Sequence, residues 1–154
     1  MTEPANLNAR IIEGLYAEGL TLSDEVRAAF DLSHQDELAD EGHSARIALS
    51  CEALRTTTRM MHSMAWLITH RAYFRKEITE FQLRRHGRIA ANLAPSAPAR
   101  LALLPPAVQD LIATTERFYA RLVRLDSGWR TPREPADAIP AVQRLRDRLL
   151  SAVG

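Results

Sequence analysis

Polar and aromatic residues are interspersed among apolar ones in the stretch "RTTTRMMHSMAWLITHRAY", which covers residues 55–73. At helical spacing its basic and aromatic members fall on one side. They are Arg55, Arg59, His62, Trp66, Thr69, His70 and Tyr73. Such a set could form a catalytic site, bind a metal, read a nucleic acid or contact another protein. The rest of the chain bears on each of these four possibilities.

Metal binding requires ligands at matched positions on neighbouring helices. The chain has five histidines, but a di-iron bundle needs Glu-x-x-His on two helices and two further glutamates. The nearest pattern is Asp40-x-x-His43, which occurs once. His62 and His70 stand eight residues apart with no carboxylate between them. We expect no metal site.

Catalytic motifs are equally absent from the sequence. The single cysteine, Cys51, lies on an apolar helical stripe, where a free thiol usually behaves as a small hydrophobic group. There is no Gly-x-Ser-x-Gly, phosphate-binding loop or dinucleotide fingerprint. We therefore expect no catalytic residue and no cofactor.

Charge is distributed unevenly along the chain. Residues 1–45 hold ten acids against two bases, giving −8, whereas residues 46–154 hold 18 bases and nine acids, giving +9. Of the twenty bases, nineteen are arginine, which suits phosphate contacts. The net charge is only +1, however, and the acidic N-terminal part would repel a polyanion. Nucleic acid is therefore not the expected partner, although a small regulatory protein acting on nucleic acid or on another signalling protein remains the alternative.

Apolar spacing predicts helices and no strands. One helix is predicted from about Asn8 to Leu32, with Gly19 tolerated inside it. A long helix should follow, from between Gln35 and Asp40 to about Arg75. Thr79 and Gln82 form a capping box before a short helix, and "LAPSAPA" is predicted to be a loop. A further helix should run from Pro106 to Gly128, and a short basic amphipathic helix should close the chain after a Pro-rich linker.

The long second helix is unusually apolar. A first stripe follows a 4-3-4-3 spacing: Ile47, Cys51, Leu54, Thr58, Met61, Ala65, Ile68 and Ala72. A second stripe lies beside it: Leu49, Ala53, Met60, Met64 and Leu67. Together they cover about half of the helix circumference, more than a one-sided amphipathic helix needs. We expect this helix to be the central element, with two neighbours against its apolar side.

The basic and aromatic strip then lies opposite this apolar arc, and two interpretations stay open. Arginine stems could cover the indole of Trp66 beneath a neighbouring segment. Alternatively the strip is a contact face, since Trp, Tyr and Arg are enriched at interface hot spots. Candidate partner-binding residues are Arg55, Arg59, Trp66, Tyr73, Arg117 and Arg121. Leu145 and Leu149 join them, because the C-terminal helix could dock on its own bundle or enter a groove on a partner.

The predicted fold class is all-α: an antiparallel three-helix bundle core with a short connecting helix and a short C-terminal helix. Residues 1–128 would form the bundle domain, and residues 129–154 the linker and amphipathic segment. No apolar run reaches the roughly 20 residues that span a membrane, and the first 20 residues do not resemble a secretory signal. With one cysteine, the chain is expected in the reducing cytoplasm, without a membrane partner.

Several segments resemble a known family. They are Arg55-Thr56-Thr57-Thr58-Arg59, Ala65-Trp66-Leu67, Glu77-Ile78-Thr79 and Tyr119-Ala120-Arg121-Leu122 before Leu125-Asp126. In this order they are similar to the alphaproteobacterial family, formerly a domain of unknown function, that is typified by the regulator of CtrA degradation, RcdA. The likeness covers most of residues 8–126. One departure is Lys76, where the family typically has Gly before Glu-Ile-Thr.

This resemblance implies a small helical bundle that forms homodimers and has no enzymatic activity. Its implied role is that of a non-catalytic adaptor or scaffold in regulated proteolysis, which helps deliver cell-cycle regulators to the ClpXP protease. The implied partners are ClpXP components and regulatory protein cargo. Nothing is carried over to residues 129–154, because that segment diverges across the family.

Overall fold

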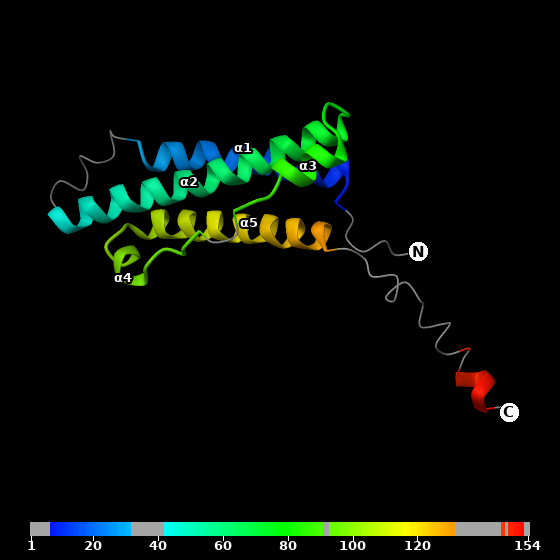
Figure 1. Cartoon of the computed structure of the whole chain (residues 1–154). Coiled ribbons are helices and arrows are strands. Elements are labelled where there is room, and N and C mark those ends of the chain that lie inside the picture. Colours follow the sequence, from blue (N-terminus) through cyan, green and yellow to red (C-terminus); the bar gives the residue numbers. More distant parts are fainter. Residues whose placement is uncertain (1–6, 32–41, 91–92, 132–145, 147, 153–154) are drawn as a thin grey trace.

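The computed structural model describes residues 7–31, 42–90, 93–131, 146 and 148–152, and its regular elements are all helices (Figure 1). They are α1 (Ala9–Ala29), α2 (His43–Phe74), α3 (Glu80–His86), α4 (Pro98–Leu101) and α5 (Pro106–Arg130). Residues 146 and 148–152 are also helical. The all-α prediction is confirmed. Within the described ranges, each helix is too short or too polar to cross a membrane.

The first helix begins where the sequence predicts. Asn8 is its N-cap, and the Asn8 side chain accepts a 2.9 Å hydrogen bond from the amide of Ile11. The apolar face buries Ile12, Leu15, Leu22 and Val26. Gly19 lies on the same buried face, where a Cβ atom would stand 2.7 Å from the sulfur of Met64. The missing side chain thus allows α1 to approach α2 closely.

The end of α2 requires a left-handed backbone at position 76, where the sequence has Lys. The amide of Glu77 donates to the carbonyl of Ala72 and that of Lys76 to the carbonyl of Tyr73, both at 2.9 Å. These two bonds form a Schellman motif, in which the residue after the C-cap is left-handed. That residue is Lys76, with φ of +61°, and among the described residues no other non-glycine residue has a positive φ. Gly adopts this conformation at no steric cost, whereas Lys does not.

Among the elements after α2, α3 and α5 begin where the sequence predicts, whereas α4 was not predicted and α5 ends later than expected. Thr79 and Gln82 form the predicted capping box of α3. The stretch predicted as a loop contains the first residues of α4, which is a single turn starting at Pro98. Pro106 opens α5 as predicted, but α5 continues to Arg130, two residues past the predicted end at Gly128. Trp129, assigned to the linker, therefore lies on the last turn of α5.

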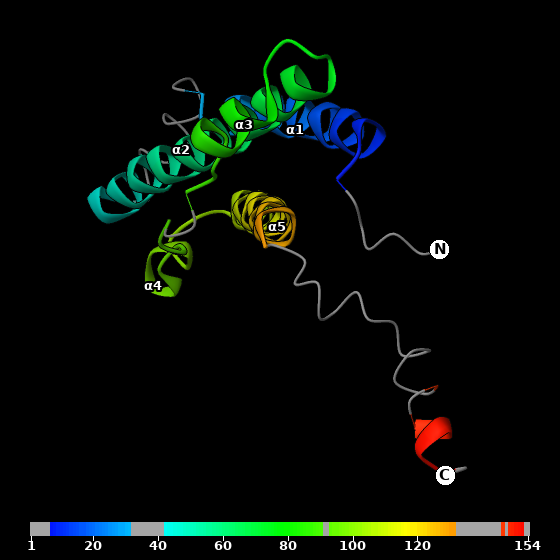
Figure 2. The ribbon, with the colours of Figure 1, turned by 45° about the vertical axis from the view of Figure 1, so that its right-hand side comes forward.

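Three long helices make the bundle, and their directions correct one feature of the prediction. Side chains early in α1 pair with late ones in α2, as in the ion pair between Glu13 and Arg71. By contrast, α2 and α5 meet in the same order along the chain, at Arg59 with Thr115 and at Trp66 with Asp126. Figures 1 and 2 show the consequence: α3 lies near the final end of α2 and α4 near its starting end, so α2 and α5 run parallel and only α1 is antiparallel.

The core lies between these three helices. Its fully buried large residues include Ile12, Leu67, Phe118 and Leu122. A smaller cluster near the start of α2 joins Ala48 and Leu49 to Leu104 and Ile112. As predicted, α2 is the central element, since both clusters include its side chains and both α1 and α5 pack against it.

Candidate functional site

The face of α2 that packs inside the bundle is largely polar. Its buried members repeat with the same 4-3-4-3 spacing as the apolar stripe, on the opposite side of the helix: Glu52, Thr56, Arg59, Ser63, Trp66 and His70. The prediction had placed the first apolar stripe against neighbouring helices and had left open whether the strip with Arg59, Trp66 and His70 is covered by a neighbouring segment or is a contact face. The structure buries the strip and leaves the first stripe outward, because α5 and the connection before it supply partners for each buried charge.

Arg59 lies at the centre of this polar seam and is 3% exposed. Its guanidinium donates to the hydroxyl of Thr115 at 3.0 Å and to the carboxylate of Glu116 at 3.4 Å. Burial lowers the pKa of Arg59 from its ordinary value, and Glu116 and Glu52 oppose that change. Arg59 stays charged at neutral pH and holds α5 against α2.

Glu52, the only acid of α2, anchors the connection that precedes α5. Its carboxylate accepts a 2.5 Å hydrogen bond from the hydroxyl of Ser96 and forms a 3.3 Å ion pair with Arg100. The amide of Ser96 also donates to Glu116 at 3.0 Å. One turn further along α2, Arg55 donates to the carbonyl of Pro95 at 3.0 Å. Removing either carboxylate would leave buried donors unpaired.

Trp66 anchors the other end of the seam. Its indole N–H donates to the carboxylate of Asp126 at 2.9 Å, and Arg130 donates to the same oxygen at 2.9 Å. Arg130 also reaches the carbonyl of Arg84 at 2.9 Å, which ties α3 to the end of α5. Because Trp66 is 3% exposed, its role in this structure is to join helices.

His70 stacks on Trp66, with ring centroids 3.9 Å apart, and meets the edge of Trp129. Its Nδ1–H donates to the carbonyl of Trp66 at 2.9 Å, while its Nε2 has no partner among the described residues. Burial lowers the pKa of His70 from 6.5, whereas the hydrogen bond to Trp66 and the charge of Asp126 oppose this change. Burial thus favours the neutral imidazole, because desolvation disfavours the charged form.

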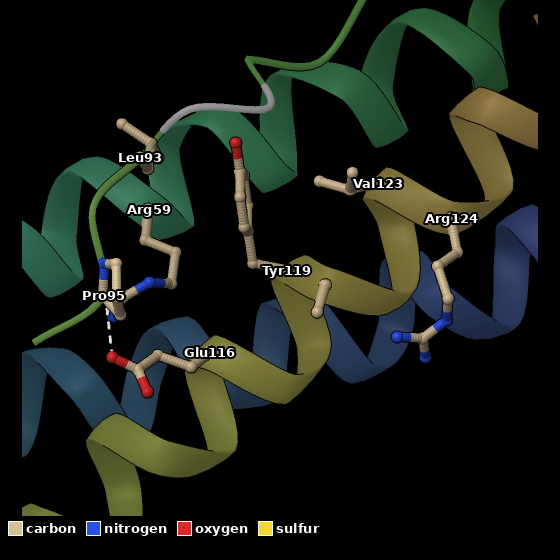
Figure 3. A pocket seen from close by; sticks show the side chains of 8 residues that line it. Arg59, Leu93, Pro95, Glu116, Tyr119, Val123 and Arg124 are labelled. Carbon is tan, nitrogen blue, oxygen red and sulfur yellow. Dashed lines mark hydrogen bonds and ion pairs between the residues drawn. The ribbon is translucent and has the colours of Figure 1, made fainter.

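A cleft of about 380 Å³ opens beside the seam, between α5 and the segment at Leu93 and Pro95 (Figure 3). Tyr119 stands across it, and Arg124 lies at its margin. Among the described residues, the buried Tyr119 hydroxyl has no hydrogen-bond partner, and burial raises the pKa of this phenol above 10.0. The cleft offers a phenolic donor, apolar surface and the charged groups of Arg59, Glu116 and Arg124, and its described lining contains no thiol, imidazole or pair of close carboxylates.

The outward face of α2 carries large apolar side chains that nothing in the described chain covers. They repeat every seven residues and keep half or more of their surface exposed: Ile47 (50%), Leu54 (71%), Met61 (67%) and Ile68 (53%). Soluble monomers seldom expose contiguous apolar patches of several hundred Å², and such patches usually mark protein interfaces. We call this face, residues 47–72 at the 4-3-4-3 positions, the α2 stripe.

The predicted partner-binding residues do not gather on one surface. Arg59 and Trp66 are buried, as the first interpretation of the strip expected, and this corrects their assignment as partner-binding residues. Arg55 is half-buried and bonded within the chain, and Tyr73 is half-buried with its ring edge against Phe74.

The remaining candidates lie elsewhere. Arg117 is exposed beside Thr114, and Arg121 forms an ion pair with Glu18 of α1. Leu149 is 60% exposed, whereas Leu145 lies outside the described residues. The predicted start of the second helix, between Gln35 and Asp40, also lies outside them.

Sequence reasoning missed the residues that complete the seam from α5. Glu116, Tyr119 and Asp126 reach α2 only because α5 runs parallel to it, and nothing in their local pattern signals this. Glu52 did leave a signal, as a lone acid among the apolar and basic residues of a long helix. In the described part of the chain, no three His, Cys, Asp or Glu side chains lie close enough together to hold a metal ion.

Comparison with known proteins assigns the chain to a family. The family described as "Protein of unknown function (DUF1465)" matches residues 4–153. The chain belongs to this family. No curated protein and no solved structure gives a significant match. For this member of the family, the α2 stripe and the polar seam are therefore the features from which a function can be argued.

Proposed function

We propose that this protein is a non-catalytic, cytoplasmic adaptor or scaffold in regulated proteolysis. In this role it helps deliver cell-cycle regulators to the ClpXP protease, and it acts as a homodimer. The specific role comes from the resemblance of residues 8–126 to the family of the regulator of CtrA degradation. The observation that carries the proposal is the uncovered α2 stripe.

The α2 stripe supports a protein-binding role because its composition suits no other kind of ligand. Its four large members are all aliphatic or thioether side chains, and the positions between them are small. It has neither the clustered arginines that a nucleic acid requires nor the enclosed shape of a small-molecule site. A second helix laid along it would remove this apolar area from water, which favours association.

Basic residues on α5 suit a second contact, with protease or cargo. Arg117 and Arg124 are exposed, and no salt bridge with either is found in the described chain. Exposed arginines of this kind suit acidic partner surfaces, where they raise the association rate and contribute hot-spot contacts. Because they lie on α5, they stay accessible when the α2 stripe is covered.

Affinity capture tests the proposal. The full chain is immobilised and incubated with native cytosol that contains a proteolytically inactive, trapped ClpXP, and ClpX is quantified. We expect several-fold enrichment of ClpX over a blank matrix. The double variant Arg117→Glu/Arg124→Glu should lose most of this enrichment. Arg10→Glu, at another exposed arginine, is the matched control and should keep it.

Absence of ClpX enrichment by the wild-type chain would overturn the proposal. In that case retention on heparin examines the alternative of a nucleic-acid-binding regulator. Strong, salt-sensitive retention together with a duplex shift at physiological salt would favour nucleic acid.

A further inference from the structure

The α2 stripe contains two kinds of position that alternate along the helix. Large apolar residues stand at every seventh position: Ile47, Leu54, Met61 and Ile68. Small residues stand four positions after each of them: Cys51, Thr58, Ala65 and Ala72. Spacing of 4-3-4-3 is the heptad pattern by which two α-helices pack along a common seam. The stripe is thus a coiled-coil face in a chain whose described part holds no helix against it.

The alternation of size decides the direction of the partner helix. In a parallel pair, equivalent positions face each other, so layers of two small residues would alternate with layers of two large ones. Every Cys51, Thr58, Ala65 or Ala72 layer would then leave a gap, which costs packing energy. In an antiparallel pair, each large position faces a small one, and the layers fill evenly. The pattern therefore favours an antiparallel partner.

The stripe is complementary to itself in one register. When two copies are aligned so that paired residue numbers sum to 119, each of the eight positions meets one of opposite size. The four kinds of layer are Ile47 with Ala72, Cys51 with Ile68, Leu54 with Ala65, and Thr58 with Met61. Shifting the register by one heptad in either direction leaves two positions of each stripe without a partner. The two-fold axis of the pair passes between Arg59 and Met60, and a symmetric interface of this kind is the common form of homodimer.

The polar groups near the α2 stripe do not oppose its packing against a second copy. Thr58 already donates its hydroxyl to the carbonyl of Leu54 at 2.8 Å, so covering it leaves no unpaired donor. At the flanks, the register sets Arg55 across from His62 and Ser50 across from Arg71 of the other copy. No two arginines face each other, and Arg71 is already paired with Glu13.

We propose that the α2 stripe packs antiparallel on the α2 stripe of a second copy of this chain, in the register that places Cys51 beside Ile68. The inference deepens the proposed homodimeric adaptor and rests on it for the biological role of the assembly. The α2 stripe spans about 38 Å, at 1.5 Å per residue over residues 47–72. One helix width along this length is less than the roughly 800 Å² per partner of a standard interface. An interface of this size suits a dimer that assembles and dissociates with protein concentration.

Cross-linking through the native cysteine tests both partner and register. In Ile68→Cys, the new thiol lies beside Cys51 of the other copy, and mild oxidation catalysed by copper–phenanthroline should give a disulfide-linked dimer at tens of micromolar. Wild-type chain should not cross-link, because the two Cys51 residues are offset by 17 positions, or about 26 Å. The control Ile68→Cys/Cys51→Ser has one thiol at position 68 and should also stay unlinked. Circular dichroism verifies that each variant is folded.

Every outcome bears on the proposal. Efficient cross-linking of the wild type would indicate a parallel, in-register pair and overturn the register. A dimer in light scattering that never cross-links in Ile68→Cys would place the interface elsewhere. A species of 17 kDa alone at tens of micromolar would exclude the second copy as occupant. Cross-linked Ile68→Cys that fails to capture ClpX would refute the proposed function while leaving the pairing intact.

Discussion

Buried ionisable side chains in this protein separate into two kinds. Arg59 and Glu52 are charged and surrounded by hydrogen-bond partners, so they fix which residues of α5 and its preceding connection face α2. His70 is different, because one of its ring nitrogens has a partner and the other has none among the described residues. Its burial costs little while it is neutral, and it makes the bundle sensitive to acid.

The pH dependence of stability follows from His70. Its folded-state pKa is lowered by burial, so the unfolded chain takes up the proton first. The stability it contributes is present above the unfolded pKa of about 6.5 and is lost as pH falls below it. We expect the free energy of unfolding in urea to fall by at most about 1.4 kcal/mol per pH unit between that value and the lowered folded-state pKa, and to level off below it.

Two variants isolate the effect between pH 7.5 and 5.5. His70→Gln should be less stable than wild type at pH 7.5 but lose less stability on acidification. His62→Gln, at an exposed histidine, should keep the wild-type dependence. Equal pH dependence in His70→Gln and wild type would show that another group is responsible.

At the scale of elements, the close approach of neighbouring helices decides how large a side chain each position of a helix can hold. Gly14 and Gly19 are both in α1, but a Cβ at Gly14 meets nothing within 4 Å. At Gly19 it would meet Met64 at 2.7 Å and Phe118 at 3.2 Å. Gly19 therefore lies where all three long helices meet, and its lower helix propensity is offset by the packing that it permits.

The two glycines form a matched pair for measurement. Gly14→Ala should raise the free energy of unfolding by about 0.5–1 kcal/mol, because Ala has the higher helix propensity. Gly19→Ala gains the same propensity but overpacks the crossing, which costs about 1–3 kcal/mol. We expect Gly19→Ala to be at least 1 kcal/mol less stable than Gly14→Ala in urea unfolding. Equal effects would mean that the neighbours of Gly19 move aside freely.

At the scale of the whole molecule, covering the α2 stripe links folding to assembly. A ligand that binds only the folded chain raises its stability with concentration, and here the ligand is a second copy. The melting temperature of the wild type should rise by a few degrees for each tenfold increase in concentration through the micromolar range.

A charged side chain placed in the α2 stripe should remove this dependence of the melting temperature on protein concentration. Leu54→Glu changes a side chain that is 71% exposed in a single chain, so it should barely alter the melting temperature at low concentration. Phe81→Glu changes an equally exposed apolar residue on α3 and should keep the wild-type dependence. If Leu54→Glu also keeps it, the assembly does not use the α2 stripe.

The sequence by itself determined the all-α class and the starts of α1, α3 and α5, because these depend on local spacing and capping. Asn8, Thr79 and Pro106 each satisfy or replace backbone donors within one turn, so neighbouring residues suffice to place them. It also determined that α2 is too apolar for one neighbour, and the 4-3-4-3 stripe was visible in the residue order. It did not determine which side of α2 faces inward.

Only the tertiary structure decided that orientation, and with it the candidate site. Arg59 and Trp66 can be buried because Thr115, Glu116 and Asp126 stand opposite them. Those partners arrive because α5 runs parallel to α2. Local patterns favour apolar residues inside, but a buried charge is stable wherever distant residues satisfy its hydrogen bonds. Such long-range pairing is absent from any single helix, and it turned the apolar stripe outward, where a second chain can meet it.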